Sequence, residues 1–313
     1  MNHPIYDKNI NGIRNRFGRF IAKTNSPIDV LKKLAEESFV RLYDNLAARR
    51  LITTFASPKE PKQWVFLVGC YNSGTTLLQN ILGSHPDISA LPREGVRFTK
   101  ALSNLELNDH HMVWDAEWTA HAHPNEKESI AAAKKIRKDW AIFWRRGANI
   151  YLDKSVSNTA RIEWLATHFP NAKFIGLHRN GYCIAEGLHR RSRPPQWLKD
   201  KTGDDHYPLE VVGQQWVTAN RAMIDGLAKV DDQMMVSFED FVQNPIAKLE
   251  EIFKFVGVSP DKLSFKDSML QINGTSFPIR NPNADSLERL GNVGKKTLAP
   301  IINEMMQELG YET

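Results

Sequence analysis

Four short, predominantly apolar segments recur along the chain, at residues 64–68, 150–152, 174–177 and 234–237. Runs of this length, bounded by glycine or polar residues, are typical of strands that are buried on both faces. Stretches with helical spacing lie between them, the first from Thr76 to Leu82. Strands that alternate with helices predict a parallel sheet covered by helices on both faces. We therefore expect an α/β fold of three layers around a central parallel sheet.

Two amphipathic patterns precede the first of these strands. Apolar residues recur at helical spacing from Ile10 to Ile21, with basic residues among them, and a second helix is predicted to begin after Ser26. The first pattern favours a basic helix that packs on its own domain or on a sister chain in a homodimer; a membrane-surface or targeting helix is the alternative. Residues 57–62 predict a linker. The predicted organisation is an N-terminal helical extension at 1–60 and one main domain at 61–313.

The composition is that of an ordinary globular protein, because 42% of the 313 residues are hydrophobic and 25% are charged. A net charge of +5 does not indicate a nucleic-acid partner and suits a small polyanionic ligand equally well. Two cysteines without a His/Cys cluster exclude a zinc site and a disulfide framework, and we expect no metal. The longest apolar run, Trp64–Cys70, is too short to span a membrane, and the N-terminus has no apolar signal region. These features favour a cytoplasmic protein without a transmembrane segment.

The segment from Gly69 to Thr76, Gly-Cys-Tyr-Asn-Ser-Gly-Thr-Thr, connects the first predicted strand to the helix that follows it. A tight turn at the start of a helix directs several backbone N–H groups at one point, and the helix dipole adds partial positive charge there. Hydroxyl groups in the turn add further donors. The segment therefore predicts a phosphate-binding loop formed by Asn72, Ser73, Gly74, Thr75 and Thr76.

The two glycines of this loop have the spacing of the Walker A motif, but Thr75 replaces the lysine that follows the second glycine in kinases and ATPases. A loop without that lysine is poorly equipped to transfer a phosphoryl group from ATP, although it can hold a 5′-phosphate. A P-loop nucleotide kinase is therefore one alternative.

A second anion site is predicted further along the chain. Arg179 follows the strand predicted at 174–177, at the end where α/β sheets bind ligands. Arg191 lies twelve residues later, a little over three helical turns, so its side chain can return to the same region. Arginine suits phosphate because its planar fork donates two parallel hydrogen bonds.

Both motifs resemble those of sulfotransferases that use 3′-phosphoadenosine-5′-phosphosulfate (PAPS). Ser-Gly-Thr-Thr-Leu-Leu, beginning at Ser73, resembles the family's 5′-phosphosulfate loop, and the segment from Arg179 to Arg191 resembles its 3′-phosphate motif. The motifs are most similar to those of tyrosylprotein-like and bacterial members, and the resemblance extends over residues 64–311. It implies a P-loop-like fold, PAPS as donor, adenosine 3′,5′-bisphosphate as product, and a hydroxyl or amine of a small molecule as acceptor.

Two positions depart from the family pattern. The loop usually carries arginine or lysine immediately before its serine, where this chain has Asn72, and the 3′-phosphate motif usually has a serine where this chain has Gly187. The first departure removes the usual cation near the bridging oxygen of the donor. The second removes a hydroxyl and makes Arg191 more important. A nucleotide-binding module without turnover is therefore the other alternative.

Sulfuryl transfer needs a base for the acceptor's proton and positive charge near the phosphate that leaves. The resemblance places a glutamate base near Glu94, with Arg97 and Phe98 beside the acceptor. The alternative for Glu94 is a loop carboxylate paired with Arg93 or Arg97. Lys154, at the end of a predicted strand, is the candidate for the cation that the loop lacks; the alternative is a solvated or ion-paired lysine.

Other aromatic and histidine residues have less defined roles. Trp114 and Trp118 are expected either in the wall of the acceptor site or in the core. His85 is expected to cap a turn, and His178 to be structural. A histidine between His110 and His123 is the alternative candidate for contact with the substrate.

Overall fold

A computed structural model of the chain describes residues 38, 42–43, 46–54, 57–58, 60–103, 113–114, 122–260 and 263–312. The chain divides into two compact units, residues 1–55 and 56–313. The first unit contains helix α3 (Leu46–Thr54). The helix predicted from Ile10 to Ile21 lies outside the described residues, so this helix and the extension over residues 1–60 stay predictions. All elements named below belong to the second unit.

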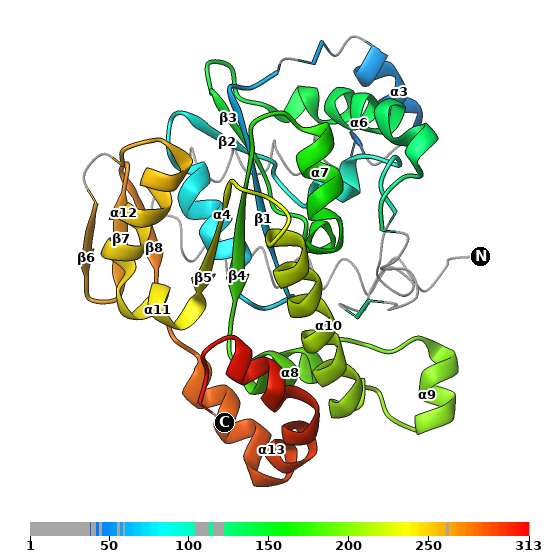
Figure 1. Cartoon of the computed structure of the whole chain (residues 1–313), viewed down its shortest axis with the longest axis vertical. Coiled ribbons are helices and arrows are strands. Elements are labelled where there is room, and N and C mark those ends of the chain that lie inside the picture. The colour runs from blue at the N-terminus through cyan, green and yellow to red at the C-terminus, as the bar shows by residue number, and fades with distance from the viewer. Residues whose placement is uncertain are drawn as a thin grey trace. The chain divides into compact units, whose positions relative to one another are not determined.

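The centre of the second unit is a parallel sheet of five strands in the order β2-β3-β1-β4-β5 (Figure 1). The α/β fold and the four predicted strands are therefore confirmed. The edge strand β2 escapes prediction, because its three residues are too few to form an apolar run. The strands are β1 (Gln63–Gly69), β2 (Ile88–Ala90), β3 (Ile150–Asp153), β4 (Ala172–His178) and β5 (Gln233–Ser237).

The strand order places the predicted site residues at one edge of the sheet. β1 pairs in parallel with β3 on one side and with β4 on the other. The carboxyl ends of these three neighbouring strands therefore lie together, and this is where open α/β sheets bind ligands. The segments that leave them carry the predicted loop at 72–76, Lys154 and Arg179.

Helices connect the strands and cover both faces of the sheet (Figure 1). The described residues also form the 3-10 helices η1 (Gly95–Phe98), η3 (Ala141–Phe143) and η4 (Val156–Arg161). The α-helices are α4 (Thr75–Gly83), α6 (Glu126–Trp140), α7 (Ile162–His168), α8 (Gly181–Arg191), α9 (Gln196–Thr202), α10 (Leu209–Leu227), α11 (Phe238–Gln243) and α12 (Pro245–Val256).

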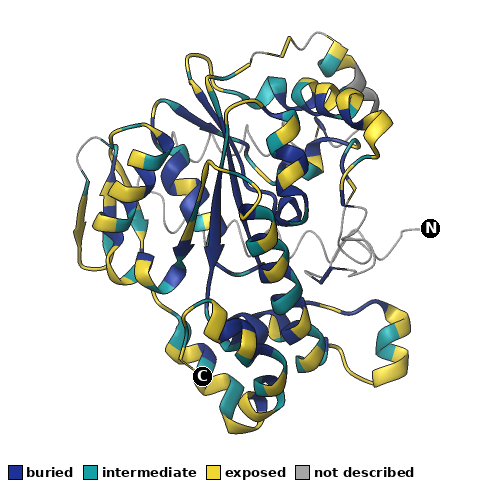
Figure 2. Cartoon of the chain, viewed as in Figure 1, coloured by how far each residue is buried: buried dark blue, intermediate teal, exposed yellow. Residues whose placement is uncertain are grey.

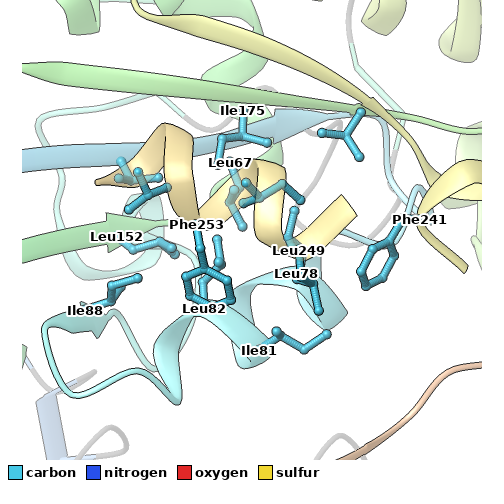
Figure 3. Packing of buried hydrophobic residues seen from close by; sticks show 14 of the residues in the cluster. Leu67, Leu78, Ile81, Leu82, Ile88, Leu152, Ile175, Phe241, Leu249 and Phe253 are labelled. Carbon is cyan, nitrogen blue, oxygen red and sulfur yellow. The ribbon is translucent and has the colours of Figure 1, made fainter. Parts of the chain in front are cut away.

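Helices α4 and α12 cover one face of the sheet (Figure 3). Leu78 of α4 and Phe253 of α12 pack with Leu67 and Ile175 of the strands, and all four side chains are buried. Burying a side chain of this size contributes roughly 1.5–3 kcal/mol relative to leaving it exposed. This core fixes α4, and with it the loop that precedes the helix.

Aromatic rings fill part of the opposite face. Successive side chains of a strand point to opposite faces, and in β1 both sets are buried (Figure 2). The ring of Trp64 lies 5.0 Å from that of Phe169 and 6.2 Å from that of Trp140 on α6, and Phe66 lies 5.5 Å from Phe174 on β4. Burial on both faces explains why β1 forms a continuous apolar run.

A small antiparallel sheet and a long helix complete the unit. Strands β6 (Ser264–Lys266), β7 (Met269–Ile272) and β8 (Thr275–Pro278) pair in sequence order, and α13 (Asn283–Glu308), interrupted at Gly291, packs against α8 and α10. Apolar runs do not predict these strands, because they are short and largely exposed. The turn at Asn273-Gly274, with φ of 48° and 77°, is the local signal that could have revealed the hairpin.

Candidate active site

The turn between β1 and α4 requires glycine at both ends. Gly69 has a φ of 144°, and a Cβ on it would lie 2.3 Å from the carbonyl oxygen of Leu177. Gly74 has a φ of 101°, and a Cβ on it would lie 2.6 Å from the ring of Phe238. Only glycine adopts such angles at little cost and tolerates such close contacts. These two residues let the chain pass directly from the buried strand into the start of α4.

Hydrogen bonds hold this loop from within. Ser73 is fully buried, and its hydroxyl donates to the carbonyl oxygen of Cys70 at 2.7 Å. The hydroxyl oxygen of Thr159, on η4, accepts from the N–H of Gly69 at 2.7 Å and donates to the carbonyl oxygen of the same residue at 3.1 Å. Ser73 thus shapes the loop, and its contact with a phosphate stays a prediction. Thr159 escaped sequence reasoning because nothing local links η4 to β1.

One pocket of about 390 Å³ joins the two predicted phosphate motifs. Its volume is within the range of small-molecule sites. Of the residues predicted to bind the donor, it contains Asn72, Gly74, Thr75, Thr76, Arg179 and Arg191. Its other described residues are Cys183, Glu186, Gly187, Arg190, Pro282, Ser286 and Arg289. Among the described lining residues, four arginines accompany one glutamate, so the pocket favours an anionic ligand.

Arg179 connects the phosphate loop to the C-terminal helix. Its Nη1 donates to the carbonyl oxygen of Asn72 at 3.0 Å, and its Nε and Nη2 donate to Oδ1 of Asn283 at 2.9 Å and 2.7 Å. Its Cζ lies 4.6 Å from the ring centroid of Phe238. Only 7% of Arg179 is exposed, and burial lowers its pKa. The side chain is thereby fixed at the pocket before any ligand binds.

A carboxylate behind Arg179 organises this connection. Glu239 Oε1 accepts from Nδ2 of Asn283 at 2.6 Å and from the N–H of Asn180 at 3.1 Å. Its Oε2 accepts from the hydroxyl of Tyr311 at 2.8 Å, and that hydroxyl lies 2.9 Å from Nδ1 of His178. Burial lowers the pKa of His178, which fits its predicted structural role. Sequence reasoning missed Glu239, Asn283 and Tyr311 as supports of the site.

Two arginines of the pocket are already paired with a carboxylate. Glu186 accepts hydrogen bonds from Nε of Arg190 and Nε of Arg289, both at 2.8 Å. Burial raises the pKa of this carboxyl, but the two arginines outweigh that effect and the pKa lies below its ordinary value. Arg191 instead donates from Nε to the carbonyl oxygen of Gly187 at 3.1 Å.

The predicted base and the predicted cation form an ion pair. Lys154 Nζ lies 2.8 Å from Glu94 Oε1, and the two side chains are 9% and 16% exposed. Lys154 follows β3, the neighbour of β1, so the pair lies at the same edge of the sheet as the phosphate loop. The structure brings these two residues together, and their catalytic roles stay predictions.

Asp153 at the end of β3 positions Glu94. Its Oδ1 accepts from the N–H of Gly95 at 2.8 Å and its Oδ2 from Nδ2 of Asn158 at 2.7 Å, and the hydroxyl of Ser155 bonds to both oxygens. Burial raises the pKa of this carboxyl to about 6, although the hydrogen bond from Gly95 opposes the rise. The signal that could have found Asp153 is its place at a strand end, directly before Lys154.

The other residues predicted near the acceptor lie in different surroundings. Arg97 is exposed on η1, whereas Phe98 is fully buried with its ring 4.2 Å from that of Phe143. The acceptor contacts of Arg97 and Phe98 stay predictions. Trp114 is buried in the hydrophobic core, which confirms the core alternative for this residue. Trp118 lies outside the described residues.

Among the described residues, no histidine forms an ion pair comparable to that of Glu94 and Lys154. His85 caps a turn, as predicted: its Nδ1 accepts from the N–H of Asp87 at 3.1 Å, and its Nε2 lies 3.0 Å from the carbonyl oxygen of Ser259. His123 is exposed, with Nδ1 3.0 Å from the carbonyl oxygen of Pro124. His110, His111 and His121 lie outside the described residues.

Three further features bear on the sequence expectations. Cys70 and Cys183 form no disulfide, and burial raises the pKa of both thiols to about 12. In the described part of the chain, no cluster of three or more His, Cys, Asp or Glu side chains could hold a metal. Among the described helices, none combines the length and the apolarity needed to cross a bilayer.

The family model described as "Sulfotransferase family" matches residues 63–262, more than half of the chain. The chain therefore belongs to the sulfotransferase family, whose members are PAPS-dependent transferases. The match spans the loop at 72–76, the Glu94–Lys154 pair and both predicted arginines.

Two curated relatives are protein-tyrosine sulfotransferases. Protein-tyrosine sulfotransferase A of Caenorhabditis elegans is 21% identical over 287 residues, which cover 80% of this chain and 67% of that protein. The protein-tyrosine sulfotransferase of Drosophila melanogaster is 23% identical over 248 residues, covering 78% of this chain and 46% of that protein. The chain thus spans less than half the length of the Drosophila relative.

Solved structures with similarity to the chain include two further sulfotransferases. One from Mycobacterium avium has a TM-score of 0.49 at 14% identity and covers 83% of this chain and 79% of its own. A mouse sulfotransferase complexed with PAP has a TM-score of 0.42 at 11% identity and covers 80% and 87%.

Proposed function

We propose that this chain transfers a sulfuryl group from PAPS to a hydroxyl or amine of a small-molecule acceptor. The observation that carries the proposal is the single pocket shared by the loop after β1 and the two arginines that follow β4. These motifs are far apart in the sequence, and each by itself predicts an anion site. Their union in one pocket suits a nucleotide that carries phosphates at both its 5′ and 3′ positions.

The residues present fit such a donor. The loop offers the exposed hydroxyl of Thr76 and the N-terminal end of α4, where backbone N–H groups favour an anion. Arg179 and Arg191 offer a second cluster of charged donors. Nδ2 of Asn72 is buried and has no hydrogen-bond partner among the described residues, so an anionic oxygen nearby would satisfy it.

The ion pair supplies the remaining chemistry. PAPS, when bound, supplies an activated sulfuryl group. Glu94 takes the proton of the acceptor's hydroxyl or amine as the acceptor atom forms its bond to sulfur. Lys154 would stabilise the negative charge that the 5′-phosphate gains when the sulfuryl group of a bound PAPS leaves the bridging oxygen and its electron pair stays behind. In this assignment Lys154 replaces the cation that Asn72 cannot provide.

The acceptor class is part of the proposal. Transfer requires only one nucleophilic atom between Glu94 and the sulfur, and a small-molecule hydroxyl or amine offers it. A tyrosine side chain offers it too, and similarity to two protein-tyrosine sulfotransferases favours a polypeptide tyrosine as the second candidate. A cytoplasmic location and a homodimer likewise stay predictions.

The test combines binding with turnover. Adenosine 3′,5′-bisphosphate is expected to raise the melting temperature without Mg²⁺, because a ligand that binds only the folded state stabilises it. PAPS is then incubated with the protein and either a metabolite extract or tyrosine peptides, and mass spectrometry identifies any product that gains a sulfuryl group. Stabilisation by ATP with Mg²⁺ but not by the bisphosphate would overturn the proposal. Bisphosphate binding without any sulfated product would favour a binding module instead.

A further inference from the structure

The two departures from the family pattern, Asn72 and Gly187, lie side by side. A Cβ built on Gly187 would lie 3.5 Å from Nδ2 of Asn72, although the two residues belong to different motifs. The same Cβ would lie 3.0 Å from Nη2 of Arg191. The absence of a side chain at position 187 therefore lets two hydrogen-bond donors come close to the Gly187 backbone, where both residues line the pocket.

These two donors cannot satisfy each other. Nδ2 of Asn72 is buried and has no hydrogen-bond partner among the described residues. Arg191 is held beside it by the bond from its Nε to the carbonyl oxygen of Gly187. A buried amide N–H without an acceptor costs free energy, and two neighbouring donors that line one pocket favour an acceptor oxygen from a bound ligand.

The backbone places the same amide beside the second phosphate site. Nη1 of Arg179 donates to the carbonyl oxygen of Asn72 at 3.0 Å, and Asn72 has a φ of 67°, in the left-handed region that asparagine tolerates. Asn72 is therefore bonded to Arg179 through its backbone and approaches Arg191 with its side chain. A neutral amide side chain adds no charge next to Arg191, whereas a lysine or arginine at position 72 would add a further cation beside Arg179 and Arg191.

We propose that the side-chain amide of Asn72 binds the donor's 3′-phosphate and replaces the hydroxyl that position 187 lacks. This inference rests on the proposed function, since it assumes that PAPS is the donor. Asn72 and Gly187 are then a matched exchange, in which the hydrogen-bond donor that is lost at position 187 is regained at position 72. A serine at position 187 would bring its Cβ against Arg191, and an asparagine at position 72 supplies the missing donor from the opposite side.

The experiment compares two nucleotides that differ only in the 3′-phosphate. Isothermal titration calorimetry measures adenosine 3′,5′-bisphosphate and adenosine 5′-phosphate on the wild type, Asn72→Gly, Gly187→Ser and the double variant. Glycine is chosen at position 72 because it accepts the positive φ. Thermal unfolding of each variant checks that it is folded. Asn72→Asp, which keeps the shape but removes the donor, is the second variant at this position.

The inference predicts that Asn72→Gly weakens binding of the bisphosphate about tenfold and leaves adenosine 5′-phosphate unchanged. Asn72→Asp weakens the bisphosphate further by charge repulsion. Gly187→Ser alone weakens the bisphosphate because Arg191 must move, but in the Asn72→Gly background it restores part of the lost affinity. The effect of the serine thus changes sign with the residue at position 72.

Equal losses for both nucleotides in Asn72→Gly, or an unchanged preference for the bisphosphate, would overturn the inference and leave the proposed function intact. Additive effects of the two substitutions would overturn the matched exchange. A wild type that shows no preference for the bisphosphate would overturn the proposed function itself, and the inference with it.

Discussion

Lys154 Nζ lies 2.8 Å from Glu94 Oε1, so the residues proposed as base and cation neutralise each other in the absence of substrate. The pair lies at the end of β3, and Asp153 fixes the backbone next to Glu94 through the N–H of Gly95. A Cβ on Gly95 would lie 2.8 Å from Oδ1 of Asp153 and 2.5 Å from the ring of Trp140. The position of the ion pair therefore depends on a glycine and on a buried carboxyl.

The Glu94→Gln variant tests the base. Glutamine keeps the size of the side chain and most of its hydrogen bonding but loses the basicity, so we expect turnover to fall by roughly 10²–10⁴. Affinity for adenosine 3′,5′-bisphosphate should stay near the wild-type value, because the phosphates are assigned to other residues. Single-turnover rates and bisphosphate affinity on the same variant separate the two effects. Near-normal chemistry would transfer the role of base to a histidine between His110 and His123.

The arginines of the pocket should contribute unequally to stability but similarly to binding. Arg179→Ala and Arg191→Ala are each expected to weaken bisphosphate binding by about 1.5–3 kcal/mol, since each removes a charge-assisted contact. Arg179→Ala should also lower the melting temperature, because it leaves Asn283 and the carbonyl of Asn72 without their donor. Lys248→Ala, which breaks an exposed ion pair on α12, is the matched control. Normal bisphosphate affinity in Arg191→Ala would show that the end of α8 does not contact the ligand.

Asp153 should make the stability depend on pH. Burial raises its folded pKa from 3.8 to about 6, so the folded state holds its proton more tightly than the unfolded state does. The free energy of unfolding contributed by this group is therefore highest below about pH 4 and falls as the pH rises to about 6. We expect the unfolding free energy of the wild type, relative to that of Asp153→Asn, to decrease between about pH 4 and about pH 6. Urea unfolding at each pH measures this difference.

Replacement of Asp153 by asparagine should be tolerated better than replacement by alanine. Oδ1 of Asn158 has no hydrogen-bond partner among the described residues, so a rotated Asn158 can accept from the new amide. Alanine would leave the buried N–H of Gly95 without an acceptor, at a cost of about 1–3 kcal/mol. Equal destabilisation by both substitutions would contradict this account.

Removing the charge of Glu186 should strengthen the pocket's attraction for anions. Glu186 neutralises Arg190 and Arg289, so Glu186→Gln leaves their positive charge uncompensated. We expect tighter bisphosphate binding with a steeper dependence on salt, together with lower thermal stability. Titrations at several NaCl concentrations measure the first two effects. Weaker binding in this variant would instead mean that Glu186 is needed to hold both arginines in place for the ligand.

The sequence predicts well those elements whose pattern of apolar residues can be recognised within one contiguous segment. β1, β3 and β4 appear as apolar runs because burial on both faces removes polar positions. β5 also forms an apolar run, although it is an edge strand in which only Val236 is buried. The three strands of the small sheet lack that constraint, since much of their surface is exposed. The Asn273-Gly274 turn between β7 and β8 is a local signal for two of them, and Asp267-Ser268, with φ of 51° and 60°, forms the turn between β6 and β7.

The residues of the candidate site likewise fall into those that a local motif reveals and those that only the folded chain brings together. The loop at 72–76 is contiguous, and Arg179 follows a predictable strand, so both are visible in the sequence. Asn283 reaches Arg179 from 104 residues away, and Tyr311 reaches His178 from 133 residues away. Asparagine and tyrosine occur in many structural environments, and no local sequence pattern predicts such a distant hydrogen-bond partner. The contact between Asn72 and Gly187 likewise requires the folded chain.

Because α13 follows all five strands in the sequence, the proposed donor site is completed only after these strands have been synthesised. A nascent chain that has completed the five-stranded sheet at Ser237 still lacks Asn283, Arg289 and Tyr311. It therefore has no complete partner set for Arg179, and one wall of the pocket is missing. Under the proposed function, the pocket is complete only after α13 has been synthesised and has folded back on α8. A product truncated before Asn283 would keep the five strands but would bind the donor more weakly, because Arg179 would lack its Asn283 partner.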